Sequence, residues 1–221
     1  MPSDFSASAG QELAEAARAR TRKTKKGQSQ KPLAQTAGLR LTFCSMDSAE
    51  YLIISASLRS NSRSRVLANY LIWCYEAEGV GSKFLDLRDS FLPFCDGETV
   101  YTHPEVISLS AAISAARVVI LATPIYNFDA SAAVKNLIEL TGEAWQNKVV
   151  GFLCAAGGAS SYMSVMSLAN SLMLDFRCLV IPRFVYVTGG EFREETLISE
   201  DAKARIRDLA LASTRIRNYQ R

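Results

Sequence analysis

The sequence holds only one histidine, His103, in its 221 residues. A single histidine does not build a His-rich metal centre, and it argues against a serine or cysteine hydrolase, because those enzymes need a histidine base. The five cysteines do not form a zinc or redox motif, since no two stand at Cys-x-x-Cys spacing. They are Cys44, Cys74, Cys95, Cys154 and Cys178. We therefore predict reduced thiols packed as small apolar side chains, and no metal site. His103, which precedes Pro104, is expected to be a structural loop residue.

Long apolar runs are missing as well. No stretch approaches the roughly 20 apolar residues that span a bilayer, and the first residues lack the basic-then-apolar pattern of a secretory signal. The excess of positive charge is confined to the start of the chain. Residues 1–50 hold eight basic and five acidic side chains, whereas residues 51–221 hold 17 of each. We predict a cytoplasmic protein that makes no membrane contact, with a body that does not bind nucleic acid.

Residues 1–48 are predicted to be a basic, disordered extension. Seven of the eight basic residues in this part of the chain lie between residues 18 and 31, where no acidic residue occurs. A solvated segment without a specific function is the favoured interpretation. The alternatives are an organelle-targeting sequence, an arm that binds RNA or another anionic surface, and a misassigned start codon. Asp4, Glu12 and Glu15 count against a transit peptide.

Residues 49–221 are predicted to form one α/β domain. Strands are expected at 51–56, 83–87, 117–123, 148–154 and 178–187, and helices at 64–78, 105–115, from Ser131 to about 141, 160–174 and 199–217. Ser131 is placed to cap the third of these helices. This alternation predicts a five-stranded parallel sheet covered on both faces. Right-handed crossovers leave two common arrangements, the flavodoxin-like order 2-1-3-4-5 and half of a Rossmann fold.

The loop after the first strand, residues 55–64, is polar and leads into a helix. It contains five serines, Asn61, Arg59 and Arg63. Charge-assisted donors at a helix N-terminus suit a phosphate group. The loop has no glycine, so it is neither a dinucleotide fingerprint nor a Walker A loop. Residues alone leave two interpretations open, an anion site and a polar helix cap.

Two further loops follow the third and fourth strands. Residues 123–131 hold Tyr126 and Phe128, which can form a wall for a flat ring or cover the core or a subunit interface; Asn127 can read the polar edge of such a ring. Residues 155–161 contain Gly157 and Gly158, which allow a ligand to approach the backbone or simply form a tight turn. In the 2-1-3-4-5 order all three loops meet at one sheet edge, beside the switch point.

These loops resemble the NADPH-dependent FMN reductase family. Ser57-Leu58-Arg59-Ser60-Asn61-Ser62-Arg63-Ser64, followed by Leu67-Ala68, is similar to the family's phosphate loop Gly-Ser-x-Arg-x-x-Ser-x-Asn/Ser with Leu-Ala after it. Pro124-Ile125-Tyr126-Asn127, with Lys135-Asn136 on the next helix, is similar to its flavin-ring motif Pro-x-Tyr-Asn…Lys-Asn. Gly157-Gly158 resembles the glycines of its third flavin loop. The likeness covers about residues 51–190.

The resemblance implies a flavodoxin-like three-layer sandwich with sheet order 2-1-3-4-5 that binds FMN. The phosphate would be held by Ser57, Arg59, Ser62 and Ser64, and the flavin ring would be lined by Pro124, Ile125, Tyr126 and Asn127, with Phe128 beside it and Gly157 and Gly158 in the third loop. Three departures from the family pattern stand out: Ala56 replaces a glycine, Ile125 a frequent glutamate, and Ser131 a frequent proline. Lys135 is expected to be a helix ion-pair partner.

The implied activity is electron transfer from NADPH or NADH, through FMN, to a small-molecule acceptor such as a quinone or a flavin. No catalytic side chain is identified. The resemblance also implies a homodimer or homotetramer, because the family builds its flavin site beside a two-fold interface. The alternative is an FMN-binding electron carrier or redox-sensing module that does not turn over NAD(P)H.

Overall fold

The computed structural model describes residues 50–217, so the predicted disordered extension over residues 1–48 lies outside the described residues. The main sheet contains β1 (Tyr51–Ser55), β2 (Ser82–Asp86), β3 (Val118–Tyr126) and β5 (Val149–Ala156), with β6 (Leu179–Val180) and β7 (Val185–Thr188) sharing the fifth position. Their order is β2-β1-β3-β5-β6, β7 also pairs with β5, and all these pairs are parallel. The flavodoxin-like order 2-1-3-4-5 is therefore confirmed.

The fifth strand is not continuous, although the sequence predicted one strand over residues 178–187. It is interrupted between β6 and β7, where Pro182 and Arg183 lie. Proline has no N–H to donate to a strand ladder, and Arg183 adopts a left-handed φ of 65°. Both features break the ladder, so β6 and β7 meet β5 at separate places.

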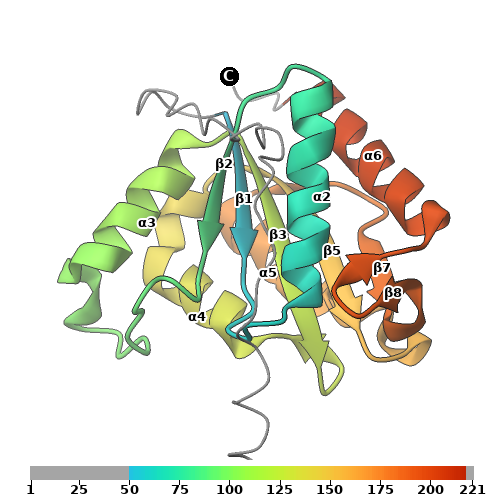
Figure 1. Ribbon diagram of the computed structural model, residues 1–221. Coiled ribbons are helices and arrows are strands. Elements are labelled where there is room, and N and C mark those ends of the chain that lie inside the picture. Colours follow the sequence, from blue (N-terminus) through green and yellow to red (C-terminus); the bar gives the residue numbers. More distant parts are fainter. Residues whose placement is uncertain (1–49, 218–221) are drawn as a thin grey trace, which may run out of the picture. The chain divides into compact units, whose positions relative to one another are not determined.

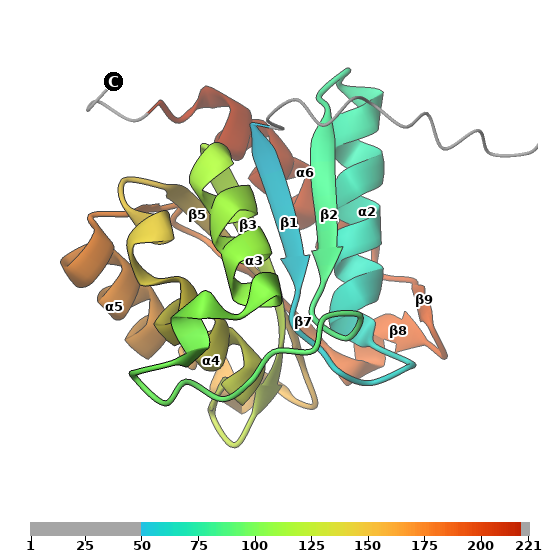
Figure 2. The same cartoon turned by 90° about the vertical axis from the view of Figure 1, so that its left-hand side faces the viewer.

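Helices cover both faces of the sheet (Figures 1 and 2). α2 (Arg63–Ala77) and α6 (Glu200–Arg215) pack on one face, and α3 (Pro104–Ala115), α4 (Ala132–Thr141) and α5 (Met166–Phe176) pack on the other. Successive strand residues point to opposite faces, so Ile53 packs with α2 whereas Leu52 and Ile54 pack with α3. Because both faces are covered, strands such as β1 are apolar at nearly every position.

Two helix predictions need correction. The fourth helix was predicted from residue 160, but α5 begins at Met166, after a single 3-10 turn at Ala159–Ser161. Ser131 occupies the N-cap position of α4, yet its side chain makes no capping hydrogen bond. Its Oγ donates instead to the carbonyl oxygen of Ala56, at 3.2 Å. Ser131 thus ties the second loop to the first one.

Two buried cations fasten the amino-terminal edge of the sheet. Lys148 donates from Nζ to the carbonyl oxygens of Ser114 and Ala116, each at 2.7 Å, where the carbonyls of α3 end and a positive charge is favourable. Arg117 forms an ion pair with Glu50 and donates from Nη2 to the Tyr51 hydroxyl at 2.9 Å.

Within residues 50–217, no helix is long and apolar enough to cross a membrane.

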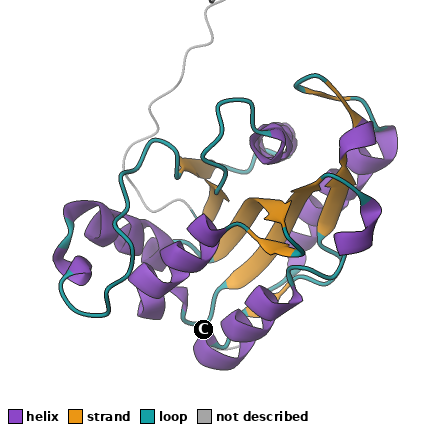
Figure 3. Cartoon of the chain, turned by 90° about the horizontal axis from the view of Figure 1, so that it is seen from below, coloured by secondary structure: helices purple, strands orange, loops and turns teal. Residues whose placement is uncertain are grey.

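The opposite edge, seen from below in Figure 3, carries the loops that follow β1, β3 and β5. The chain leaves β1 toward β2 on one side and reaches β3 on the other, so the switch point lies between β1 and β3. Two short additions flank this edge. β4 (Asp129–Ala130) folds back on β3, and β8 (Phe192–Arg193) pairs with β9 (Thr196–Leu197) in a hairpin that the sequence did not predict.

Candidate functional site

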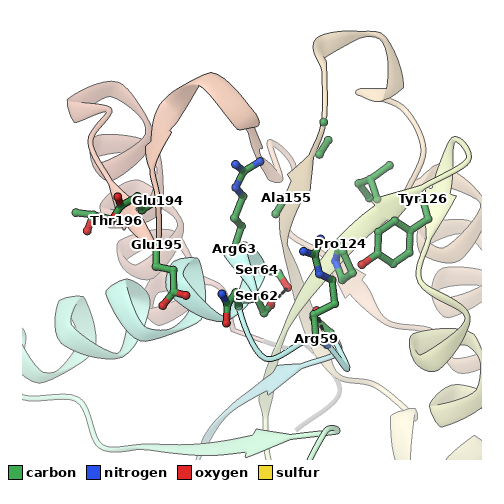
Figure 4. Close-up of a pocket in the computed structure, with 15 residues that line it drawn as sticks. Arg59, Ser62, Arg63, Ser64, Pro124, Tyr126, Ala155, Glu194, Glu195 and Thr196 are labelled. Atoms are coloured by element: carbon green, nitrogen blue, oxygen red, sulfur yellow. Dashed lines mark hydrogen bonds between the residues drawn. The ribbon is translucent and has the colours of Figure 1, made fainter. Parts of the chain in front are cut away.

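A cavity of about 830 Å³ opens at this carboxyl edge. Four segments line it: the loop after β1, the end of β3, the end of β5 and the β8–β9 hairpin. The lining residues are Ser57, Arg59, Asn61, Ser62, Arg63, Ser64, Pro124, Ile125, Tyr126, Ala155, Ala156, Gly157, Glu194, Glu195 and Thr196. Figure 4 shows Tyr126 and Pro124 at one end, the serines and Arg59 in the middle, and the hairpin residues at the other end.

The middle of the cavity is built on the N-terminus of α2. Ser62 is the N-cap, and its Oγ accepts the N–H of Arg65 at 3.1 Å. Helix geometry leaves the N–H groups of Arg63 and Ser64 without acceptors inside the helix. The positive end of the helix dipole adds to these donors. This region is therefore suited to an anion.

Three buried serines line the same cavity. Ser62 Oγ and Ser64 Oγ share one hydrogen bond of 3.0 Å, so one of their two hydrogens stays available. Ser57 Oγ only accepts, from the N–H of Arg59 at 3.4 Å, so its hydrogen is available too. Buried polar groups need partners. Two hydroxyl hydrogens can thus be donated to oxygen atoms of a ligand.

Ala56, where the family pattern has glycine, does not disturb this loop. Its N–H donates to the carbonyl oxygen of Ala122 at 2.9 Å, which continues the pairing of β1 with β3. Its φ is not positive, so the position does not require glycine.

Two arginines line the cavity, whereas the family resemblance implies only Arg59 as a ligand of the phosphate. Arg63, the first residue of α2, also contributes, and its guanidinium carbon lies 5.4 Å from the centroid of the Phe192 ring. Arg63 belongs to the loop that the sequence singled out, but its direction depends on Phe192, which is far away in the chain. The cavity therefore holds two arginine side chains, one more than predicted for the phosphate.

The other end of the cavity is apolar. Pro124, Ile125 and Tyr126 come from the end of β3, and Ala155 and Ala156 from the neighbouring end of β5. Tyr126 is 47% exposed, so its ring forms one open wall of the cavity. This end provides a flat, partly open surface of the kind that an aromatic ring needs.

Three predicted ligand residues do not line the cavity: Asn127, Phe128 and Gly158. Asn127 and Phe128 form the turn between β3 and β4 and have φ values of 50° and 65°. Two left-handed residues are what a tight hairpin of this kind needs, and Phe128 is 66% exposed as a result. Gly158 uses its carbonyl oxygen to accept the Tyr186 hydroxyl at 2.6 Å, whereas Gly157 does line the cavity.

The acidic end of the cavity could not be predicted from the sequence. Glu194 and Glu195 form the tip of the β8–β9 hairpin, and Thr196 follows them. In Figure 4 they lie on the far side of Ser62 from Tyr126. No local motif marked these residues, because only the pairing of β8 with β9 directs them to the cavity.

The residues Lys135 and Asn136 lie on α4 and do not line the cavity. Lys135 forms the predicted helix ion pair, with Glu139 at 3.2 Å. Asn136 donates from Nδ2 to the carbonyl oxygen of Pro93 at 2.9 Å and accepts the N–H of Cys95 at 2.9 Å. Asn136 thus fastens the loop between β2 and α3, which is a structural role.

The remaining predictions concern His103 and the cysteines. His103 is the N-cap of α3 and accepts the Glu105 N–H at Nδ1, at 3.3 Å, so its structural role is confirmed. Cys74, Cys154 and Cys178 are buried and unpaired, and Cys95 is half-buried. Burial raises the pKa of the Cys154 thiol from 9.0 to about 12, so this thiol is inert at neutral pH. Cys44 lies outside the described residues.

The fold and the cavity together define the class of protein. A parallel sheet of this order, with a cavity lined by serines and arginines beside an apolar wall at the switch point, is typical of a flavodoxin-like mononucleotide-binding domain. The chain belongs to the NADPH-dependent FMN reductase family, which matches residues 50–192. It is accordingly an oxidoreductase that uses FMN and a reduced nicotinamide cofactor.

Comparisons with individual proteins agree with this family. The chain is 31% identical over 137 residues to an NAD(P)H-dependent FAD/FMN reductase of Geobacillus thermodenitrificans, covering 59% of this chain and 72% of that protein. It is 29% identical over 160 residues to an NADPH azoreductase of Bacillus sp., covering 72% and 86%. The solved flavoenzyme NAD(P)H:(acceptor) oxidoreductase FerB of Paracoccus denitrificans superposes with a TM-score of 0.61 at 18% identity, covering 74% and 93%. This last likeness concerns the fold.

Proposed function

We propose that the cavity at the carboxyl edge holds FMN and that the protein passes electrons from NAD(P)H to a quinone, a flavin or a similar acceptor. The observation that carries the proposal is the juxtaposition of two unlike sites in one cavity of about 830 Å³. The anion site lies at the start of α2, and the apolar site lies at the ends of β3 and β5. FMN has the same two parts, a phosphate and a flat ring.

The donor set fits a phosphate dianion. Ser57 and the Ser62–Ser64 pair each keep one hydroxyl hydrogen for the ligand, and Arg59 and Arg63 supply the charge. Hydrogen bonds in which the donor or the acceptor is ionised are shorter and about twice as strong as neutral ones. In this proposal the hydroxyls orient the phosphate and the two arginines neutralise it.

The apolar end fits a flavin ring. Pro124, Ile125 and Ala156 remove water from one side, while the exposed ring of Tyr126 leaves another side accessible. When bound, FMN supplies the redox chemistry, taking electrons from a nicotinamide and giving them to an acceptor. The side chains bind the cofactor, orient it and shield one face of it from water. The open side gives the nicotinamide and the acceptor their access.

Similarity supports the choice of acceptor. The relatives include proteins named NAD(P)H-dependent FAD/FMN reductase, NADPH azoreductase and FMN-dependent NADH:quinone oxidoreductase. Flavins, azo compounds and quinones are all planar conjugated molecules. An open apolar site beside Tyr126 suits any of these flat acceptors better than it suits a bulky or highly charged one.

The decisive experiment mixes the FMN-loaded protein with NADPH in the absence of oxygen. We expect the visible absorbance of the flavin to bleach within the mixing time and to return when a quinone is added. A flavin that stays oxidised with both NADPH and NADH would contradict the proposal and indicate an electron carrier. A protein that neither retains FMN nor quenches its fluorescence would contradict the cofactor site itself.

We further propose that the protein is a homodimer or homotetramer. Support comes from exposed apolar side chains near the ring end of the cavity, namely Tyr126, Phe128, Tyr162, Met163 and Met166. Ser167 Oγ donates to Asp129 Oδ1 at 3.3 Å, which places the start of α5 beside the β3–β4 turn that carries Phe128. Apolar clusters of this kind on a protein surface commonly mark interfaces. Sedimentation of only a monomer at micromolar concentration would contradict this.

The proposed location is the cytoplasm. The four described cysteines are all free, as expected in a reducing compartment. Fractionation of cells that produce the tagged full chain tests this, and recovery in an organelle fraction would assign targeting to residues 1–48 instead.

A further inference from the structure

The back of the loop after β1 is closed by a third arginine, Arg65, which does not line the cavity. Its side chain is only 17% exposed. Its Nη1 donates to the carbonyl oxygens of Ser60 at 2.9 Å and of Arg59 at 3.3 Å, and its Nη2 donates to the carbonyl oxygen of Ser57 at 3.4 Å. One guanidinium therefore gathers three carbonyl groups of the loop.

Arg65 is itself held by the sheet. Its Nε donates to Oδ2 of Asp86, the last residue of β2, whose side chain is 8% exposed. The other carboxylate oxygen of Asp86 accepts the N–H of Arg88 at 3.1 Å. Asp86 is also the register partner of Ser55, the last residue of β1. Arg65 and Asp86 thus form a clamp that connects the loop, which emerges from β1, to the neighbouring strand β2.

The clamp decides which polar groups of the loop face the cavity. In a planar trans peptide the C=O and the following N–H point in opposite directions. Carbonyls of Ser57, Arg59 and Ser60 that point at Arg65 send the next three N–H groups, those of Leu58, Ser60 and Asn61, the other way. Of these three residues Asn61 lines the cavity, as do its neighbours Arg59 and Ser62. Three repulsive carbonyl oxygens are therefore turned toward Arg65, which does not line the cavity, and the N–H groups lie on the opposite side of each peptide.

We propose that Arg65, anchored by Asp86, is a positioning residue for the flavin phosphate. It acts through the loop backbone and does not touch the phosphate. This inference rests on the proposed function, because it takes the loop after β1 to be the phosphate site. Its direct charge contribution is small, since the carboxylate of Asp86 neutralises it at contact distance.

A positioning role and a simple charge role make opposite predictions for two variants. Arg65→Lys keeps the positive charge but loses the planar fork that reaches three carbonyls. Asp86→Asn adds one net positive charge near the loop but releases Arg65. If charge is what matters, Arg65→Lys binds FMN normally and Asp86→Asn binds it more tightly. If positioning is what matters, both variants bind FMN more weakly.

The test measures the dissociation constants of FMN and of riboflavin, which lacks the phosphate, by quenching of flavin fluorescence. The set comprises the wild type, Arg65→Ala, Arg65→Lys and Asp86→Asn. Arg88→Ala is the matched control, because it removes an exposed arginine near Asp86 without breaking the clamp. We expect FMN to bind about 10- to 100-fold more weakly to both Arg65 variants. This is the effect of losing one or more charge-assisted hydrogen bonds between the loop and the phosphate. Asp86→Asn should show a smaller loss in the same direction.

Riboflavin binding and the melting temperature separate positioning from general damage to the fold. Riboflavin affinity should change by less than about twofold in all variants, because riboflavin lacks the phosphate that the loop would bind, so at most one weak contact with it is altered. An equal loss for both flavins, an unchanged Arg65→Lys variant, or tighter FMN binding by Asp86→Asn would each overturn the proposal. Should Arg65→Ala fail to fold, Arg65→Lys and Asp86→Asn still decide the question.

The variant Arg59→Ala distinguishes a failure of the clamp proposal from a failure of the phosphate assignment. If the wild type prefers FMN to riboflavin and Arg59→Ala removes that preference while the Arg65 variants keep it, only the clamp is wrong. If the wild type shows no preference, the phosphate assignment is wrong, and the role of Arg65 is refuted with it.

Discussion

Arg63 lies over the face of Phe192, with its guanidinium carbon 5.4 Å from the ring centroid. Gly189 also lies beside the guanidinium, since an added Cβ there would lie 2.9 Å from Nη1 of Arg63 and 3.5 Å from the carbonyl oxygen of Gly157. The guanidinium therefore has two close neighbours, the Phe192 ring and Gly189, which together form the slot that holds it. This slot fixes the direction of the second cationic side chain in the cavity.

Gly189→Ala should weaken FMN binding without destabilising the fold. The new methyl group meets only the flexible end of Arg63 at close range, so the arginine moves and the backbone does not. Partial loss of one charge-assisted contact predicts a decrease in affinity of about 3- to 10-fold. Gly190→Ala is the matched control, because an added Cβ there meets nothing within 4 Å. Identical FMN titrations for the two variants would contradict the role of the slot.

Arg59→Ala and Ser62→Ala should differ in their effects on stability. Arg59 is exposed, so its loss should weaken FMN binding by about 10-fold or more, spare riboflavin, and leave unfolding unchanged. Ser62 also caps α2 through the N–H of Arg65. Ser62→Ala should therefore lower the free energy of unfolding by about 1 kcal/mol and reduce FMN affinity less than Arg59→Ala does. Urea unfolding and parallel flavin titrations measure both quantities. A Ser62→Ala protein of wild-type stability would argue against the cap.

Gly151→Ala should destabilise the core and leave the cavity intact. Gly151 lies in β5, and an added Cβ would stand 2.7 Å from Cδ1 of Ile120 and 3.1 Å from Cδ1 of Leu209. Overpacking of this kind costs about 1–3 kcal/mol of the free energy of unfolding. Chemical denaturation should show the loss, while the FMN dissociation constant at low temperature should stay at the wild-type value. A variant as stable as the wild type would mean that α6 moves away from β5 at little cost.

Stability should fall in alkaline solution partly because of Cys154. Burial raises the pKa of this thiol from 9.0 to about 12 in the folded protein. Below pH 9 the thiol keeps its proton in both the folded and the unfolded state, so its contribution to the free energy of unfolding is fully present. Between about pH 9 and pH 12 only the unfolded state releases the proton, so the free energy of unfolding falls by up to about 1.4 kcal/mol per pH unit.

The variant Cys154→Ala isolates this contribution. Its free energy of unfolding should decline less steeply than that of the wild type between about pH 8.5 and about pH 10.5. The comparison of slopes removes the other buried groups, such as Tyr75, whose pKa burial also raises. Parallel decline of the two proteins would show that Cys154 becomes accessible before unfolding.

Local sequence patterns were sufficient for the architecture. Strands buried on both faces are continuous apolar runs, so β1, β3 and β5 were visible without any knowledge of their neighbours. Their alternation with helices, and the right-handed crossover rule, restricted the sheet to a few orders. The serines and Arg59 of the first loop could be found as well, because they follow a strand and precede a helix. Ser57, Ser62 and Ser64 do line one cavity.

Long-range geometry decided the rest. Arg63 turns toward the cavity because of Phe192 and Gly189, and Glu194 and Glu195 reach it because β8 pairs with β9. Asn127 and Phe128 stay out of the cavity because a two-residue turn sends them to the tip of a hairpin. The sequence by itself determined the main strands and helices and which loop could bind an anion, since these depend on periodicity and local chemistry. The tertiary structure alone decided which side chains meet, because contact between segments far apart in the chain depends on strand register and on the direction of each turn.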